Sequence, residues 1–132
     1  MEYKKRGIEL WYVGGNNTKP LLDLPLEKVI HPIFYFCDWD YNGLQIFSRI
    51  KGIFNRKKVH IDLLEPLDLS IAIPTNVPHH KSSWKREQFS RLVKDDFTDS
   101  QKTIITTLIN NDEWIEEESM NLIDILEKEQ MI

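Results

Sequence analysis

The stretch from Ile33 to Leu44 constrains the fold of this chain more than any other. An apolar run at 33–37 leads into Asp38, Trp39 and Asp40, and a turn with a helical pattern follows. This order favours a buried strand whose carboxyl end presents carboxylates. Because side chains alternate along a strand, we expect both aspartates to point one way and Trp39 to point away from them.

The end of that strand is where an α/β protein would place a ligand. In open α/β sheets, ligands bind just beyond the carboxyl ends of the strands. Two carboxylates there suit Mg²⁺, which is usually held by one or two carboxylates together with substrate phosphates, and Mn²⁺ accepts the same oxygen ligands. We therefore predict that Asp38 and Asp40 bind Mg²⁺ or Mn²⁺.

One alternative for the same residues is a calcium loop. Asp38, Asp40, Asn42 and Gly43 fit the first, third, fifth and sixth positions of an EF-hand. Its last position needs a bidentate Glu, and Arg49 stands there instead. The segment before the loop is also a β-type run, whereas an EF-hand requires a helix there.

A second alternative is a haloacid-dehalogenase-like phosphatase, in which Asp38 would be the nucleophile. That family also begins with Asp-x-Asp after a strand, but it continues with a small Gly-Thr turn where this chain has Tyr41 and Asn42. Residues 94–96, Lys-Asp-Asp, resemble the later lysine and acidic motifs of that family, although too little chain separates them from the Asp-x-Asp motif. Trapping phosphate on Asp38 would support this alternative.

A third interpretation is favoured by a resemblance. Residues 34–46 resemble the Asp-x-Asp-x-x-Gly segment of Toprim domains, in particular the version in the topoisomerase VI A subunit and in the JetD nuclease subunit of Wadjet plasmid-defence systems. Residues 11–16 look like the preceding strand and glycine turn of JetD-like proteins, and residues 114–120 look like their C-terminal hydrophobic-Glu-Gln-Glu motif. The resemblance spans about residues 8 to 127 and is dense in these three patches.

The resemblance implies a Toprim-like, Rossmannoid fold and a metal-dependent activity on DNA. Asp38 and Asp40 would be the catalytic metal ligands, and a DNA-binding domain or upstream segment would lie outside this chain. A homodimer is compatible with it. Toprim domains also carry a catalytic Glu on an earlier strand, and Glu9 does not fall at that place. We therefore expect the C-terminal part of a longer protein, or a non-catalytic remnant that serves as an interaction domain.

Composition is consistent with a single domain of 132 residues, large enough for a hydrophobic core. The net charge of −4 argues mildly against DNA binding, although the acidic residues crowd into 112–129. The single cysteine, Cys37, excludes an internal disulfide and fits a small core residue in a reducing cytoplasm. The sequence contains no run of 18 apolar residues, so it predicts no membrane span.

The remaining pattern predicts an α/β protein with a small parallel sheet and a helical C-terminal half. We expect parallel strands at 8–13, 33–38 and 59–63, with 33–38 central, and a further short strand around 69–73. The first three predicted helices are 19–24, 44–54 and 84–93. A fourth helix begins with a capping box at Thr98 and ends at 110–111. The last helix is capped by Asp112 and has Glu116, Glu117 and Glu118 at its start.

Basic side chains suggest where DNA phosphates would bind. One group follows the outer face and end of the helix after Asp40, and another follows the loop that holds His79 and His80 and includes Trp84. The predicted DNA-contacting residues are Arg49, Lys51, Lys57, Lys58, Lys85 and Arg86.

Overall fold

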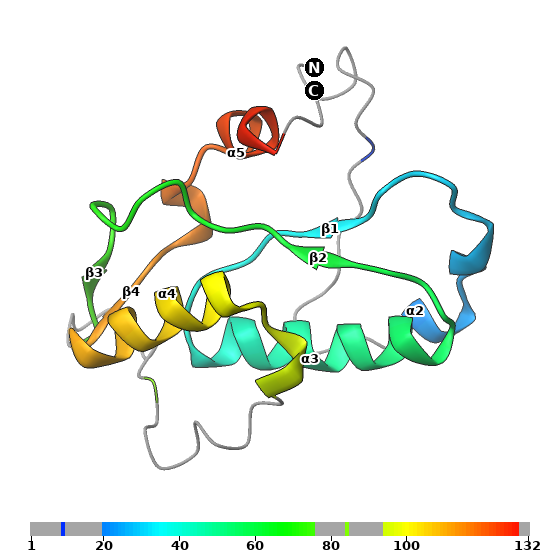
Figure 1. The fold of residues 1–132 in the computed structure, drawn as a ribbon, viewed down its shortest axis with the longest axis horizontal. Coiled ribbons are helices and arrows are strands. Elements are labelled where there is room, and N and C mark those ends of the chain that lie inside the picture. The colour runs from blue at the N-terminus through cyan, green and yellow to red at the C-terminus, as the bar shows by residue number, and fades with distance from the viewer. Residues whose placement is uncertain (1–8, 10–19, 76–83, 85–93, 130–132) are drawn as a thin grey trace.

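The computed structural model describes residues 9, 20–75, 84 and 94–129. Short strands and helices make up the first half, and the part after residue 94 is mostly helical (Figure 1). The mixed α/β class is therefore confirmed. In chain order the elements are α2 (Pro20–Asp23), η1 (Leu26–Lys28), β1 (Phe34–Tyr35), α3 (Tyr41–Arg56), β2 (Asp62–Leu63), β3 (Ile73–Pro74), η3 (Lys94–Asp96), α4 (Asp99–Asn110), β4 (Glu113–Trp114), η4 (Glu117–Ser119) and α5 (Leu122–Lys128).

Strands β1 and β2 form the small parallel pair that the sequence predicts. Phe34 lies opposite Asp62 and Tyr35 opposite Leu63, and the Leu64 N–H donates to the Tyr35 carbonyl at 2.9 Å. The long helix α3 connects the two strands and runs along one side of them (Figure 1). This strand–helix–strand unit is the one that makes parallel pairing accessible to the chain.

Both strands are shorter than the predicted ranges 33–38 and 59–63. After β1 the backbone leaves β2, and Trp39 forms an isolated bridge with Ile115 instead. The hydrogen bonds that would have lengthened β1 are thus made with the C-terminal part of the chain. The strand predicted at 8–13 lies outside the described residues except for Glu9, so the central position of β1 stays a prediction.

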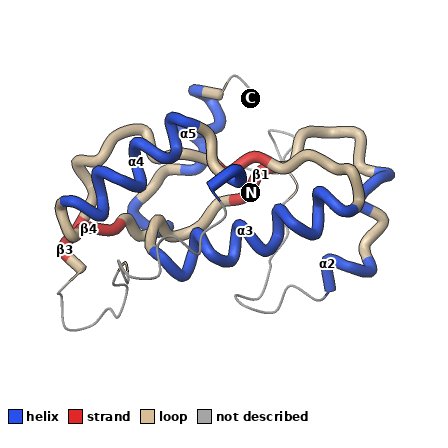
Figure 2. The backbone as a smooth tube through the Cα atoms, turned by 60° about the horizontal axis from the view of Figure 1, so that its bottom comes forward, coloured by secondary structure: helices blue, strands red, loops and turns tan. Residues whose placement is uncertain are grey.

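Helix α3 begins and ends close to the predicted range of 44–54, and its buried side chains form one apolar face. Phe47 is the centre of this face: its ring lies 5.8 Å from that of Tyr35 on β1 and 5.9 Å from that of Phe97 before α4. The inward residues of α3 are Tyr41, Gly43, Leu44, Phe47, Ile50, Ile53 and Phe54. Helix α3 therefore joins the parallel strands to the C-terminal helices (Figure 2).

Helix α4 begins with the predicted capping box. Thr98 Oγ1 accepts from the Gln101 N–H at 3.1 Å, and Gln101 Oε1 accepts from the Thr98 N–H at 3.0 Å. The same buried side chain also donates from Nε2 to the Leu63 carbonyl at 3.0 Å. Gln101 thus forms hydrogen bonds both with Thr98 at the start of α4 and with the Leu63 carbonyl of β2, and these bonds hold α4 against the parallel strands.

The prediction for the last helix is wrong. Asp112 does not cap it but has φ 51° at the end of α4, where the chain reverses. Residues 113–114 then form β4, antiparallel to β3, with Ile73 opposite Trp114. Helix α5 starts only after Asn121, whose side chain accepts from the Asp124 N–H at 3.1 Å. Burial of an apolar Trp-Ile pair favours an extended segment over the helix that the composition suggested.

Glu116, Glu117 and Glu118 therefore do not sit at the start of α5. They lead into and form the 3₁₀ turn η4, ahead of that helix. The extra strand predicted around 69–73 is present only as Ile73–Pro74.

The core is continuous around α3. Cys37 is buried in it, as the sequence predicts, and Trp39 and Ile115 are fully inaccessible to solvent. None of the helices in the described part of the chain combines the length and apolar character needed to cross a bilayer.

Replacing Gln101 by Glu tests its bond to β2. The carboxylate keeps the acceptor for Thr98 but cannot donate to Leu63, so a buried carbonyl loses its partner and faces a negative charge. We expect a loss of about 1–3 kcal/mol in the free energy of unfolding at pH 7, measured by urea denaturation. Ser100→Ala, which removes only an exposed bond to Glu65, is the control and should cost less than about 0.5 kcal/mol. Equal stability of Gln101→Glu and wild type would contradict this role.

Candidate functional site

Asp38 and Asp40 lie between β1 and α3, after the carboxyl end of the strand, as predicted. Their surroundings differ. Asp40 is buried, with 4% of its surface exposed, and is the N-cap of α3: its Oδ1 accepts from the Gly43 N–H at 2.7 Å. Asp38 is only half-buried, and its Oδ1 accepts from the Glu117 N–H at 2.7 Å. Asp40 thus has a structural task, whereas Asp38 is the more accessible carboxylate.

Gly43 allows the first turn of α3 to approach Asp38 closely. A Cβ built on Gly43 would lie 2.2 Å from the Asp38 carbonyl oxygen and 3.2 Å from Asp40 Oδ1. No real side chain tolerates such a contact with backbone. The glycine of the Asp-x-Asp-x-x-Gly pattern is therefore required by packing between the helix and the segment that carries the two aspartates.

A pair of backbone hydrogen bonds brings the C-terminal part of the chain to this place. The Trp39 N–H donates to the Ile115 carbonyl at 2.9 Å, and the Ile115 N–H donates to the Trp39 carbonyl at 3.2 Å. Glu117 follows two residues later and reaches Asp38. From its sequence position Glu117 is predicted at the start of the last helix and not at this site, although residues 114–120 form one of the three patches of the family resemblance.

The site is strongly negative. Burial raises the pKa of Asp38, the hydrogen bond from Glu117 lowers it, and the charges of Asp40, Glu118 and Glu116 raise it further. Although the Glu117 side chain is exposed, partial desolvation raises its pKa, and the charges of Asp38 and Glu118 raise it further. Burial raises the pKa of the Cys37 thiol, and so do the charges of Asp40, Asp38 and Glu117. Burial also raises the pKa of the Tyr35 hydroxyl, followed by the charges of Cys37, Glu117 and Asp38. A proton or a cation close to these carboxylates would reduce the repulsion among their negative charges.

The set of oxygen donors fits a weakly held hard cation. Asp38 and Asp40 are close enough for the charge of one to raise the pKa of the other. Among the residues that the structure describes, no three His, Cys, Asp or Glu side chains are placed to share a metal ion. Two carboxylates completed by water agree with the usual environment of Mg²⁺ but not with a tight site made by protein alone.

The predicted DNA-contacting residues fall into two groups. Lys51 Nζ donates to the Asp96 carbonyl at 3.3 Å and lies 5.9 Å from the Phe47 ring centroid, and Lys57 Nζ donates to the Leu24 carbonyl, after α2, at 2.6 Å. Both lysines thus make contacts within the fold. Arg49 and Lys58 are exposed on α3 and just after it.

Other predicted contacts fall around Trp84. Lys85 and Arg86 lie outside the described residues, as do His79 and His80. Trp84 itself is buried, and its Nε1 donates to the Glu113 carbonyl at 2.6 Å, so it belongs to the core and not to a DNA-contacting patch.

None of the described contacts joins Asp38 to residues 94–96, which would carry the later motifs of a phosphatase site. Asp96 is buried beside Ser48 and Lys51, more than two turns along α3 from Asp40. Burial raises its pKa, and those two neighbours oppose the rise.

The two described glycines of α3 should respond oppositely to alanine. Gly43→Ala places a methyl against the Asp38 carbonyl, and we expect it to lower the free energy of unfolding by about 1–3 kcal/mol or more. Gly52→Ala has no atom within 4 Å of the new Cβ and should raise it by up to ~1 kcal/mol through helix propensity. Denaturant unfolding of both variants measures this. A stabilising Gly43→Ala would show that α3 does not need the close approach.

Asp38→Asn tests the electrostatic cost of the site. Asn keeps an acceptor for Glu117 but has no charge. A carboxyl whose pKa is raised in the folded state destabilises the fold when it is ionised, and the cost disappears once the pH falls below its ordinary value of 3.8. Without divalent cations, Asp38→Asn should therefore melt at a higher temperature than wild type at pH 7, and the difference should shrink towards pH 3. A pH-independent difference would contradict this origin.

Comparison with known proteins leaves the function open. No protein-family model matches the chain, and neither a curated protein nor a solved structure matches it significantly. Any assignment therefore depends on the residues and contacts described above.

Proposed function

We propose that the chain is a Toprim-like domain that binds Mg²⁺ or Mn²⁺ weakly at Asp38 and Asp40 and belongs to a protein that acts on DNA phosphodiesters. The observation that carries this proposal is the position of the two aspartates, between the carboxyl end of β1 and the first turn of α3 in a strand–helix–strand unit. Ligand sites of α/β proteins lie at such a place.

The electrostatics of the site support a cation. Asp38 is half-exposed and surrounded by like charges, and the opposing contribution to its pKa is a hydrogen bond from a backbone N–H. A divalent cation held there would supply positive charge to offset the charge that builds on a scissile phosphate. Asp38 is the carboxylate that would bind it from solvent, and Asp40 adds a second negative charge while it caps α3.

The catalytic Glu that Toprim domains carry on an earlier strand has no counterpart at the matching place in this sequence, because Glu9 does not fall there. General acid–base help is worth ~10²–10⁴-fold, so its loss would leave a trace of activity at most. A second domain would supply the attacking group and most of the DNA affinity.

A second candidate is a non-catalytic Toprim remnant that serves as an interaction domain. The specific observation in its favour is that Asp40 is buried as a helix cap and that the described residues contain no three-ligand metal group. In that case the Asp-x-Asp-x-x-Gly pattern would be needed only for folding, because Asp40 caps α3 and Gly43 packs closely against Asp38.

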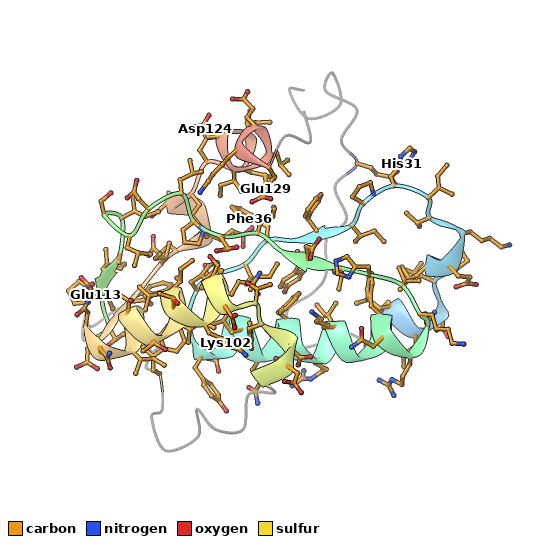
Figure 3. All side chains as sticks on the ribbon, in the orientation of Figure 1. His31, Phe36, Lys102, Glu113, Asp124 and Glu129 are labelled. Carbon is orange, nitrogen blue, oxygen red and sulfur yellow. The ribbon has the colours of Figure 1, made fainter. Side chains whose placement is uncertain are left out.

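Cation binding separates the two candidates. Titration with Mg²⁺ or Mn²⁺ up to ~10 mM should shift the NMR signals of residues 37–43 and 116–118 selectively, since Mg²⁺ held by so few carboxylates binds weakly. Asp38→Asn should lose these shifts. Asp124→Asn, which removes an exposed carboxylate on α5, is the matched control and should keep them (Figure 3). Signals that do not move in wild type would favour the interaction domain.

DNA cleavage should be slight. With supercoiled plasmid and Mg²⁺ or Mn²⁺, the isolated chain should nick DNA poorly or not at all, because the described residues form no three-ligand metal group and the chain is acidic. The double variant Asp38→Ala, Asp40→Ala is the comparison. Strong nicking that the double variant loses would mean that another carboxylate completes the site, and equal nicking by both proteins would point to a contaminant.

A further inference from the structure

We infer that Glu117 is a positioning residue for Asp38, acting through its backbone N–H, and this inference rests on the proposed cation site. The relevant juxtaposition is the 2.7 Å hydrogen bond from the Glu117 N–H to Asp38 Oδ1, which joins residues 79 positions apart. The cation-binding geometry of the Asp-x-Asp strand end would then depend on the C-terminal turn η4.

The hydrogen bond determines how the Asp38 carboxylate is turned. Rotation of a carboxylate about its last torsion is broad, so an unrestrained Asp presents its oxygens in many directions. A short bond from an N–H to an ionised oxygen is among the stronger hydrogen bonds in proteins. Because Oδ1 is held by Glu117, the direction of the second oxygen of Asp38 is set as well.

The donor is itself held firmly. Trp39 and Ile115, both fully buried, exchange two backbone hydrogen bonds immediately before it. After it, the Met120 N–H donates to the Glu117 carbonyl at 3.1 Å, and the Met120 side chain is buried. The Glu117 N–H thus lies between two hydrogen-bonded, buried positions, whereas the Glu117 side chain is exposed.

Proline at position 117 removes the donor with little other change. Glu117 is the first residue of η4, where a helix-type turn leaves the N–H without a partner of its own and where proline is favoured. Glu116 has φ −76° and ψ 137°, an extended conformation that a following proline prefers. Glu117→Gln is the matched control, because it removes the side-chain charge and keeps the N–H.

The experiment measures Mg²⁺ affinity from the NMR shifts of residues 37–43 in folded wild type, Glu117→Pro and Glu117→Gln. Glu117→Pro should weaken binding about tenfold, because the freed Asp38 carboxylate must then be ordered when the cation binds. Glu117→Gln should weaken it by no more than about threefold, the effect of one charge at a solvent-exposed position. Equal affinity of Glu117→Pro and wild type, or an equal loss in both variants, would overturn the inference.

A second measurement is independent of cation binding and of whether the proline variant folds. In wild-type protein, a scalar coupling across the hydrogen bond between the Glu117 amide nitrogen and the Asp38 carboxyl carbon should be present. Its absence overturns the positioning role. If the coupling is present but wild type binds no cation, the contact stands and the proposed function fails, so the two failures can be distinguished.

Discussion

The two backbone hydrogen bonds between Trp39 and Ile115 hold the arrangement together. They end the parallel pairing of β1 early, they place Glu117 at Asp38, and they bury both side chains completely. A pair of net hydrogen bonds is worth only about 1–3 kcal/mol, whereas burial of the two apolar side chains contributes roughly twice as much. The C-terminal segment is therefore part of the same core as the strand end, although it lies far away in sequence.

The first turn of α3 imposes a second constraint on the same few residues. Asp40 must accept from the Gly43 N–H, and Gly43 must lack a side chain because the Asp38 carbonyl fills that space. A pattern that looks like metal chemistry is thus also a folding requirement. Capping alone does not need Asp38, however, and a half-buried carboxylate among like charges is destabilising when it is ionised.

Local signals predicted the local structure well. The apolar period indicated α3, and the Thr98–Gln101 capping box indicated the start of α4, because each depends on residues within a few positions. The last helix was mispredicted because Asp112 adopts a left-handed backbone and β4 pairs with β3, which composition cannot reveal. The position of Asp38 followed from the strand pattern, whereas its contact with Glu117 could not, since nothing local links residues 79 apart.

Charge decides what a domain of this kind can do with DNA. Lys51 and Lys57 donate to backbone carbonyls within the fold, so they serve α3 and α2 at least as much as any phosphate. The surface near Asp38 is acidic and would repel a phosphate diester unless a cation lay between them. Under the proposed function, a cation at Asp38 would therefore be the condition for a phosphate to approach this surface.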